Sequence, residues 1–459
     1  MRSTTPSGSE AEDAEGEERI ATREILVYSA PVLGVFFANS LISFYFLKYA
    51  TDVLLIVPAL AGTILLGGRI WDAVTDPLVG HWSDRTRSRM GRRRPWFLAS
   101  AVPLGLSVIA LWSPPETLTG RALTLWLAVA FLVYLTFYTT FRVPHMALGA
   151  ELTRGYHDRT RVFGVMQIVE NAGILLAAGG LAFIENADAP REAAATLSRG
   201  IAVMVIVLVL WASWRLRERS EFQGRGGAGS YRAFRDVMAN PHARLLVGIF
   251  FLEQLGFASL LTLMPYLSDY VVQTPGRTFL YLMGAIVSMA ASVPAWIVLS
   301  RRFGKRAIWI GSLIAKLVIF ASLAIVGEGD AALLAIGAIA FGVVAGAGNV
   351  VGPSLKADVI DWDEAESGER KEGAYFAAWN FVQKAAGGFS GWMIGIVLTA
   401  TGFVANAAQG EAALLGIRLL ASPWPLLLHA LALVLVWRFT LDEAAHRAAR
   451  DRAGSRRTG

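Results

Sequence analysis

Long apolar runs, separated by short polar connections, make up most of this 459-residue chain. A run of roughly 20 apolar residues is long enough to cross a bilayer as an α-helix. Apolar and polar residues do not alternate within these runs, which argues against a membrane β-barrel. The pattern predicts an all-α membrane protein with twelve transmembrane helices, near residues 25–49, 55–82, 95–113, 121–148, 162–184, 199–215, 243–270, 277–299, 306–326, 331–355, 374–402 and 414–438.

The longest interior polar stretch, from about Leu216 to Asn240, follows the sixth run. It divides the runs into six plus six, and the motif MGRRRP after the second run has a weak echo in FGKRA after the eighth. Two six-helix halves with a substrate site between them at mid-membrane form the major facilitator fold. The predicted boundaries are a disordered cytoplasmic tail at 1–23, an N-terminal bundle at 24–216, a cytoplasmic linker at 217–241, a C-terminal bundle at 242–439 and a cytoplasmic tail at 440–459.

Composition and charge fit this class. The chain is 54% hydrophobic and 17% charged, with a mean hydropathy of +0.48, whereas soluble domains carry about a quarter charged residues. The formal net charge is +6, and the basic residues gather in alternate connections such as RTRSRMGRRR and RRFGKR. Twelve spans place both termini on the same side, and an excess of Lys and Arg marks the cytoplasmic loops of membrane proteins, so we expect both termini on the cytoplasmic side of the cell inner membrane. The same rule accounts for the basic charge, so no nucleic-acid partner is expected.

Motifs for soluble chemistry do not occur in the sequence. The chain has no cysteine, no nucleotide-binding loop and no HExxH or GxSxG motif. None of its connections is long enough to hold a soluble ATPase domain. We therefore expect a monomer that is not an enzyme and needs no cofactor, with a small-molecule substrate and membrane lipid as its partners.

Charged residues inside the apolar runs are the strongest functional candidates. A charge at bilayer depth costs roughly several kcal/mol unless it faces the bundle interior or water. Three basic and four acidic side chains occur there, a sum of −1, so one bound monovalent cation or one proton would neutralise the set. These residues are Arg69, Asp72, Asp76, Arg142, Glu170, Glu253 and Lys384.

Asp72 and Asp76 are four residues apart, so both carboxylates project from one helix face. Thr75 adds a hydroxyl oxygen, and two carboxylates with neutral oxygens suit a hard cation such as Na⁺. A close pair of carboxylates also suits a shared proton. The alternative is that Arg69 pairs with Asp72 and that the remaining polar atoms are packing.

The connection after the second run offers a candidate gate. Asp84 and Arg85 open its series of arginines. Asp84 could pair across helices and hold the inward gate closed, and Arg69 belongs to the same gating hypothesis. The alternative is that this connection is only a topology anchor.

Several long motifs together resemble a known family. They are RIWDAVTDPLVG (69–80) followed by SDRTRSRMGRRRP, VPHMALGAEL with DRTR (143–161), KADVIDWDEAESGERKEG (356–373), and Lys384 in the eleventh run. The chain resembles the glycoside–pentoside–hexuronide:cation symporters, the melibiose-permease-like branch of the major facilitator superfamily. The resemblance extends from the first run to the twelfth.

The resemblance implies a site for Na⁺, Li⁺ or H⁺ on the second and fourth helices. Asp72 and Asp76 match the paired aspartates of the family's cation site, and Thr75 stands where the melibiose permease has an asparagine. Thr139 matches a threonine that helps to coordinate the cation. Lys384 matches a lysine that links the cation region to the substrate cavity.

The family's sugar-binding residues are not retained. Arg142 stands where the family has a sugar-binding aspartate, Met146 where it has a tryptophan, Gln167 where it has an arginine, and Phe36 where it has an acid. A galactoside held by a carboxylate–arginine pair is therefore not expected. Arg142 instead favours a substrate with a negative group, because guanidinium binds carboxylate or phosphate bidentately. The alternative, compatible with it, is that Arg142 pairs with Glu170.

The function predicted from these features is a Na⁺- or H⁺-coupled symporter that imports a sugar, glycoside or uronide by alternating access. The same branch includes a sodium-dependent lysophosphatidylcholine transporter of animals, with a basic residue at the Arg142 position and an acid at the Glu170 position, so a lysophospholipid is the alternative substrate. A non-transporting membrane sensor is the second alternative. The expected substrate-binding residues are Arg142, Met146, Gln167, Glu170, Trp379, Asn380 and Lys384.

Overall fold

The structure, a computed structural model, describes residues 20–153, 155–218, 235, 237–368 and 371–439. Nearly all of the predicted tail at 1–23, all of the tail at 440–459 and most of the predicted linker at 217–241 lie outside these residues. The predictions made for those segments remain predictions.

Within the described residues the chain is helical and contains no strand. Its elements are α2 (Thr22–Lys48), the π-helix η1 (Tyr49–Val53), α3 (Pro58–Arg85), α4 (Arg94–Trp112), α5 (Gly120–Glu151), α6 (Tyr156–Glu185), α7 (Pro190–Arg215), α9 (Pro241–Tyr266), the π-helix η3 (Leu267–Val271), α10 (Thr278–Phe303), α11 (Lys305–Leu323), α12 (Ala331–Ser367), α13 (Glu372–Ala400), α14 (Glu411–Ala421) and α15 (Pro423–Trp437).

The all-α membrane fold class is confirmed. The predicted number of spans is twelve, and the structure neither confirms nor contradicts that number. Eleven helices of the described chain are long and apolar enough to cross a membrane. The second predicted span, α3, is 28 residues long but is not among them, and it carries Arg69, Asp72 and Asp76 in its middle. The last predicted span consists of α14 and α15, which meet at Ser422.

Two predicted boundaries were wrong. The sixth span was expected to begin near residue 199, whereas α7 begins as helix at Pro190. The tenth span was expected to end near residue 355, with KADVIDWDEAESGERKEG as a connection, whereas α12 continues as helix to Ser367. Hydropathy marks where apolar residues stop, and a helix continues beyond that point when its charged residues face water or one another. Lys305 of α11 bonds to Asp358 in this extension at 2.6 Å, which ties its charge to the neighbouring helix.

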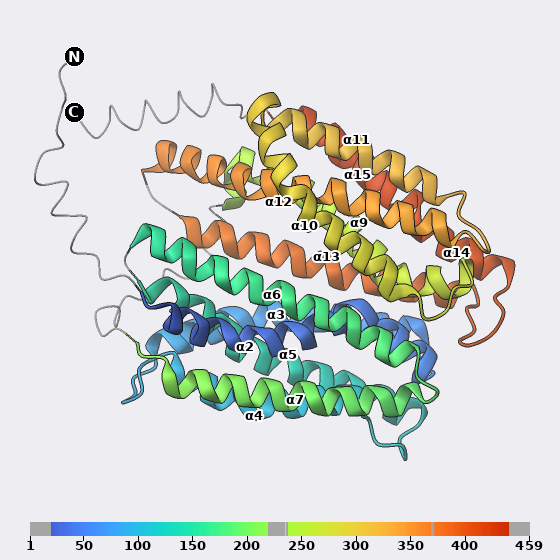
Figure 1. Cartoon of the computed structure of the whole chain (residues 1–459), viewed down its shortest axis with the longest axis horizontal. Coiled ribbons are helices and arrows are strands. Elements are labelled where there is room, and N and C mark those ends of the chain that lie inside the picture. Colours follow the sequence, from blue (N-terminus) through green and yellow to red (C-terminus); the bar gives the residue numbers. More distant parts are fainter. Residues whose placement is uncertain (1–19, 154, 219–234, 236, 369–370, 440–459) are drawn as a thin grey trace, which may run out of the picture.

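The helices form two groups, with α2 to α7 in the lower part of Figure 1 and α9 to α15 in the upper part. Within the groups, α2 packs on α6 and α7, α4 on α5 and α7, and α10 on α12. We call the end of the bundle where α2 begins the proximal end, and the end where η1 follows α2 the distal end. Successive helices run alternately between these ends, so chemistry-bearing residues far apart in the sequence meet at one depth.

The two halves join most closely between α3 and α13. A Cβ atom on Gly62 would lie 2.6 Å from the carbonyl oxygen of Gly391, and one on Gly395 would lie 2.3 Å from that of Pro58. These backbones therefore touch at glycines, as small residues allow in membrane helices. The close approach brings the charged middle of α3 against Lys384 of α13.

Candidate functional site

The two predicted cation-site aspartates lie together with a lysine from the other half. The Nζ atom of Lys384 is 2.7 Å from Asp76 Oδ2 and 3.3 Å from Asp72 Oδ2. Arg69 Nη1 is also 3.3 Å from Asp72 Oδ2, so the alternative pairing of Arg69 with Asp72 is present too. The Lys384 ammonium thus sits at the position between the two carboxylates where the sequence predicted a cation.

The remaining predicted cation ligands lie at the same place. Thr139 on α5 donates a hydrogen bond to Asp76 Oδ1 at 2.8 Å. Thr75 is buried, and its hydroxyl donates to the carbonyl of Trp71 on its own helix at 3.1 Å. The Oδ1 atom of Asp72 is buried without a hydrogen-bond partner in the described structure. A buried carboxylate oxygen with no donor is an open ligand position, which suits a hard cation.

A second charged pair lies next to this cluster, on α5 and α6. Arg142 Nη2 donates to Glu170 Oε1 at 2.7 Å, and the guanidinium carbon lies 4.9 Å from the centre of the Phe36 ring of α2. The other terminal nitrogen, Nη1, is buried and has no partner among the described residues. Arg142 is therefore paired with Glu170 and still presents unused N–H groups, so both of the interpretations weighed for this residue are compatible with the geometry.

The other expected substrate residues separate into two groups. Met146 and Gln167 are exposed and lie one helical turn from Arg142 and Glu170 respectively, and Asn380 is exposed one turn before Lys384. Trp379, in contrast, is only 5% exposed. Its ring packs 5.5 Å from that of Phe250 in the core of the C-terminal half, so it is not brought to the ion cluster.

Two of the three candidate gate residues, Asp84 and Arg85, lie at the proximal end. Asp84 bonds to Arg93 at the start of α4, and Arg93 also lies 3.4 Å from Glu151 at the end of α5. Arg85 is exposed. Asp84 thus ties neighbouring helices of one half together. Arg69 lies deeper, in the ion cluster.

Lys316 is a buried lysine that the predicted charge sum did not include. Lys316 of α11 lies within the ninth predicted run, and its Nζ is 2.5 Å from Glu253 Oε2 of α9. Trp309 Nε1 donates to the other carboxylate oxygen at 2.7 Å. Adding Lys316 to the seven residues of that sum gives four basic and four acidic side chains, so the sum over this set is zero rather than −1.

Replacing Lys316 by Met is expected to destabilise the C-terminal half, because Glu253 would keep a buried charge without a cation. Losing one partner of a buried ion pair costs about 3–5 kcal/mol. Thermal unfolding in detergent measures this loss. The double variant Lys316→Met/Glu253→Gln should recover part of the stability, and a single variant as stable as the parent would contradict the expectation.

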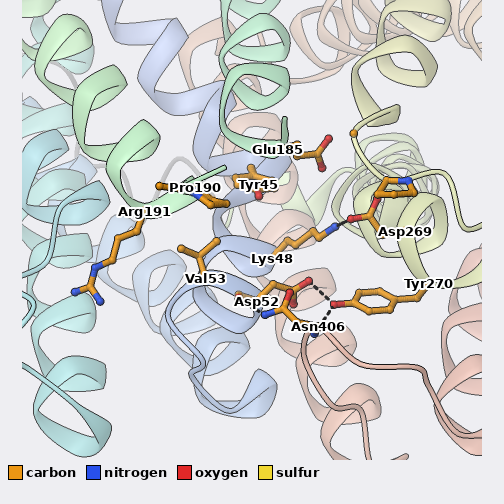
Figure 2. Close-up of a pocket in the computed structure, with 13 residues that line it drawn as sticks. Tyr45, Lys48, Asp52, Val53, Glu185, Pro190, Arg191, Asp269, Tyr270 and Asn406 are labelled. Atoms are coloured by element: carbon orange, nitrogen blue, oxygen red, sulfur yellow. Dashed lines mark hydrogen bonds and ion pairs between the residues drawn. The ribbon is translucent and has the colours of Figure 1, made fainter. Parts of the chain in front are cut away.

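A cluster that joins the halves at the distal end was not predicted from the sequence (Figure 2). Lys48 of α2 bonds to Asp269 of η3. Asp52 of η1 accepts a hydrogen bond from Tyr270 at 2.6 Å, and Asn406, after α13, donates to the Asp52 carbonyl at 2.7 Å. These residues line a cavity of about 620 Å³. Direct contacts between the halves therefore close the distal end.

A family model described as MFS/sugar transport protein matches residues 27–443. The chain belongs to this family. The resemblance drawn from the motifs is thereby confirmed, and the protein is a multi-pass membrane transporter of the major facilitator type rather than an enzyme.

Relatives of this chain match it over most of its length. An uncharacterized symporter of Synechocystis is 27% identical over 92% of this chain and 94% of its own length. The sodium-dependent lysophosphatidylcholine symporter 1 of Gallus gallus is 25% identical, covering 96% and 91%. The isoprimeverose transporter of Lactiplantibacillus pentosus is 25% identical, covering 82% and 79%. The crystal structure of a D-xylose–proton symporter shares the fold with a TM-score of 0.66 at 14% identity, covering 91% and 98%.

Proposed function

We propose that this chain is a cation-coupled symporter that imports a sugar, glycoside or uronide by alternating access. Its family, and the symporters among its relatives, support this class of activity. The observation that carries the coupling is the Lys384 ammonium held between the carboxylates of Asp72 and Asp76.

The charges of this cluster suggest how an ion is coupled to the solute. Arg69 and Lys384 balance Asp72 and Asp76, so an added Na⁺, Li⁺ or H⁺ leaves an excess charge in the membrane unless one basic group withdraws. Lys384 comes from the other half and is one quarter exposed, so it is the group that can move. Ion binding at the two aspartates then releases the Lys384 ammonium toward the substrate cavity.

The coordinating atoms for that ion are supplied by α3 and α5. They are the unpartnered Oδ1 of Asp72, the carboxylate of Asp76, and the hydroxyl oxygens of Thr75 and Thr139. A threonine oxygen that donates one hydrogen bond still has lone pairs for a metal ion. Oxygen ligands of this kind suit Na⁺ and Li⁺, and the carboxylates alone suit a proton.

The solute is proposed to carry a negative group that binds Arg142. Its buried Nη1 has no partner in the described chain, and a guanidinium offers parallel donors to a carboxylate, sulfonate or phosphate. Lys384, once released, adds a second positive charge to the proposed substrate site. The exposed Met146, Gln167 and Asn380 supply the remaining contacts.

A lysophospholipid is the second candidate solute, because a sodium-dependent lysophosphatidylcholine symporter is 25% identical over 96% of the chain. It would place its phosphate at Arg142 and so uses the same observation. Uptake of an acidic glycoside and of a lysophospholipid, measured in parallel, separates the two.

We further propose that the protein lies in the cell inner membrane with its proximal end facing the cytoplasm. The arginine-rich segments at 85–94 and 301–306 lie at that end, in accord with the positive-inside rule. With the distal end closed, this conformation is then the one from which solute is released inward.

Adding Na⁺ or Li⁺ to the purified protein is expected to raise its thermal stability and change its tryptophan fluorescence saturably. Trp71 precedes Asp72 and donates to Thr136 of α5 at 2.9 Å, so it reports on movement between α3 and α5. Choline chloride at the same ionic strength is the control, and Trp71→Phe should remove most of the fluorescence change without removing the thermal shift.

The outcomes separate the hypotheses. A saturable response to Na⁺ or Li⁺ identifies a metal-coupled carrier, and a response to a pH step without one identifies proton coupling. No response to metal or pH contradicts the proposal and favours a non-transporting sensor.

A further inference from the structure

We propose that Lys48 is a gating residue that exchanges ion-pair partners: Asp269 of the other half when the distal end is closed, and Asp52 of its own half when that end opens. This inference rests on the proposed alternating access, which requires the distal contacts to break and re-form. None of these three residues belongs to the ion cluster around Lys384, which lies deeper in the bundle.

In the closed arrangement the Lys48 ammonium depends on the C-terminal half. Lys48 is only 4% exposed. Its Nζ bonds to Asp269 and lies 3.4 Å from the carbonyl oxygen of Pro265, and it is 5.6 Å from the centre of the Tyr270 ring. In Figure 2 the side chain extends from α2 directly to Asp269. Separation of the halves removes all of these partners together.

The Asp52 carboxylate is also held in part by the C-terminal half. It is 8% exposed, and Tyr270 donates to its Oδ2 while Thr51 donates to its Oδ1 at 2.7 Å. Asn406 fixes the backbone carbonyl of Asp52. Tyr270 and Asn406 belong to the C-terminal half, so opening the distal end frees one carboxylate oxygen of Asp52 at the same moment as it frees Lys48.

Lys48 and Asp52 are close in sequence, so they remain neighbours after the halves separate. Lys48 ends α2, and Asp52 follows four residues later in the π-helix η1. Residues four apart lie on one face of a helix, one turn from each other, and the wider π-turn retains this neighbourhood. A lysine left buried without a carboxylate is strongly unfavourable. Pairing with Asp52 removes that cost and lets the distal end open reversibly.

Glu185 of α6 is the competing carboxylate. It lines the same cavity and accepts a hydrogen bond from Thr278 of α10 at 3.0 Å, while its Oε2 is buried without a partner in the described structure. Arg191, the other basic residue of the cavity, points away from Lys48 in Figure 2 and bonds to the carbonyls of Pro114 and Pro115. The spacing on one helix favours Asp52 over Glu185 as the partner of Lys48.

The absence of cysteine from the sequence allows a direct test by thiol labelling. Thr278 is fully buried at the contact between the halves, so Thr278→Cys is labelled by a maleimide only when the distal end opens. Asp188→Cys, on the exposed connection after α6, is the control for reagent access. Labelling rates are measured in the Thr278→Cys background without added solute, at fixed salt and pH.

Asp269→Asn should speed labelling by about tenfold, the size expected for losing a charge-assisted bond, because only the closed state loses its ion pair. Asp52→Asn should also be made in two backgrounds, one with Lys48 and one with Lys48→Gln. With Lys48 present, the substitution should slow labelling about tenfold more than it does in the Lys48→Gln background. Comparing the two backgrounds cancels the contribution of Tyr270, whose hydroxyl can still donate a hydrogen bond to the side-chain oxygen after Asp52→Asn. In the Lys48→Gln background, Asp269→Asn should have little effect.

The coupling of two residues is the difference between the effect of one substitution with and without the other. The exchange is supported if the coupling of Lys48 with Asp269 favours closure and the coupling of Lys48 with Asp52 favours opening. A coupling of 48 with 52 that is zero or favours closure overturns it, as does a coupling that appears only with Glu185→Gln. No labelling of Thr278→Cys in any variant also overturns it. Uptake is measured separately, so loss of transport with intact couplings would count against the proposed function and leave the exchange standing.

Discussion

Replacing Asp76 by Asn is expected to abolish ion-driven uptake while leaving the fold intact. Asp76 makes the shorter contact with Lys384, at 2.7 Å, and accepts the hydrogen bond from Thr139. Without its charge the site keeps one carboxylate, already shared between Arg69 and Lys384. A further cation would then enter a cluster with a net positive charge, which membrane burial makes prohibitive.

The measurement is uptake into proteoliposomes driven by a Na⁺, Li⁺ or proton gradient, beside the thermal shift on adding the ion. Both should fall to the level of protein-free vesicles or buffer. The matched control is Asp188→Asn, an exposed aspartate on the connection after α6, which should behave like the parent.

A second variant covers the case in which Asp76→Asn does not fold. Asp76→Asn/Lys384→Gln restores a balance of one acid and one base in the cluster, so it should be at least as stable as the single variant and equally inactive. Ion-driven uptake at the parental rate by either variant would refute the assignment of the ion site to Asp76.

The ion cluster was accessible to sequence reasoning because its chemistry is local. Asp72, Thr75 and Asp76 share one face of α3 through their spacing alone, and the motif around them is long. Their relation to Lys384, 308 residues away from Asp76, came only from the family resemblance. That the ammonium itself lies between the carboxylates came only from the structure.

Other parts of the site depend on pairs that no local pattern reveals. Lys316 stands alone in an apolar run, and its partner Glu253 lies 63 residues earlier. Lys48 ends the first run, where a lysine is usually an anchor that extends toward the membrane surface. The structure instead buries it against Asp269, 221 residues later. Hydropathy describes how each segment meets lipid and cannot report which charges meet across a helix interface.

The extension of α12 shows the same limitation in the fold. The acids and bases after residue 355 end the hydrophobic pattern, and a connection was predicted there, yet the backbone remains helical to Ser367. Trp379 gives the opposite lesson for the site. It lies near Lys384 in sequence, but five residues place it on another face of α13, where it packs in the core.

Replacing Arg142 by Gln is expected to lower the uptake of an acidic glycoside by about 10- to 150-fold. This range corresponds to losing a hydrogen bond to a charged group, about 1.5–3 kcal/mol, at 1.4 kcal/mol per factor of ten. A neutral glycoside of the same size should lose far less, because it never used the charge. Methyl glucuronide and methyl glucoside form a suitable pair, with lysophosphatidylcholine as the third solute.

Glu170 must be controlled in this experiment, because its buried carboxylate loses its partner in Arg142→Gln. The double variant Arg142→Gln/Glu170→Gln removes that instability and should show the same selective loss. Arg142→Lys keeps the charge without the planar fork and should fall between the parent and Arg142→Gln. Glu170→Gln alone should strengthen binding of the acidic solute, since it frees the guanidinium. An equal loss for acidic and neutral glycosides would instead make Arg142 a purely structural partner of Glu170.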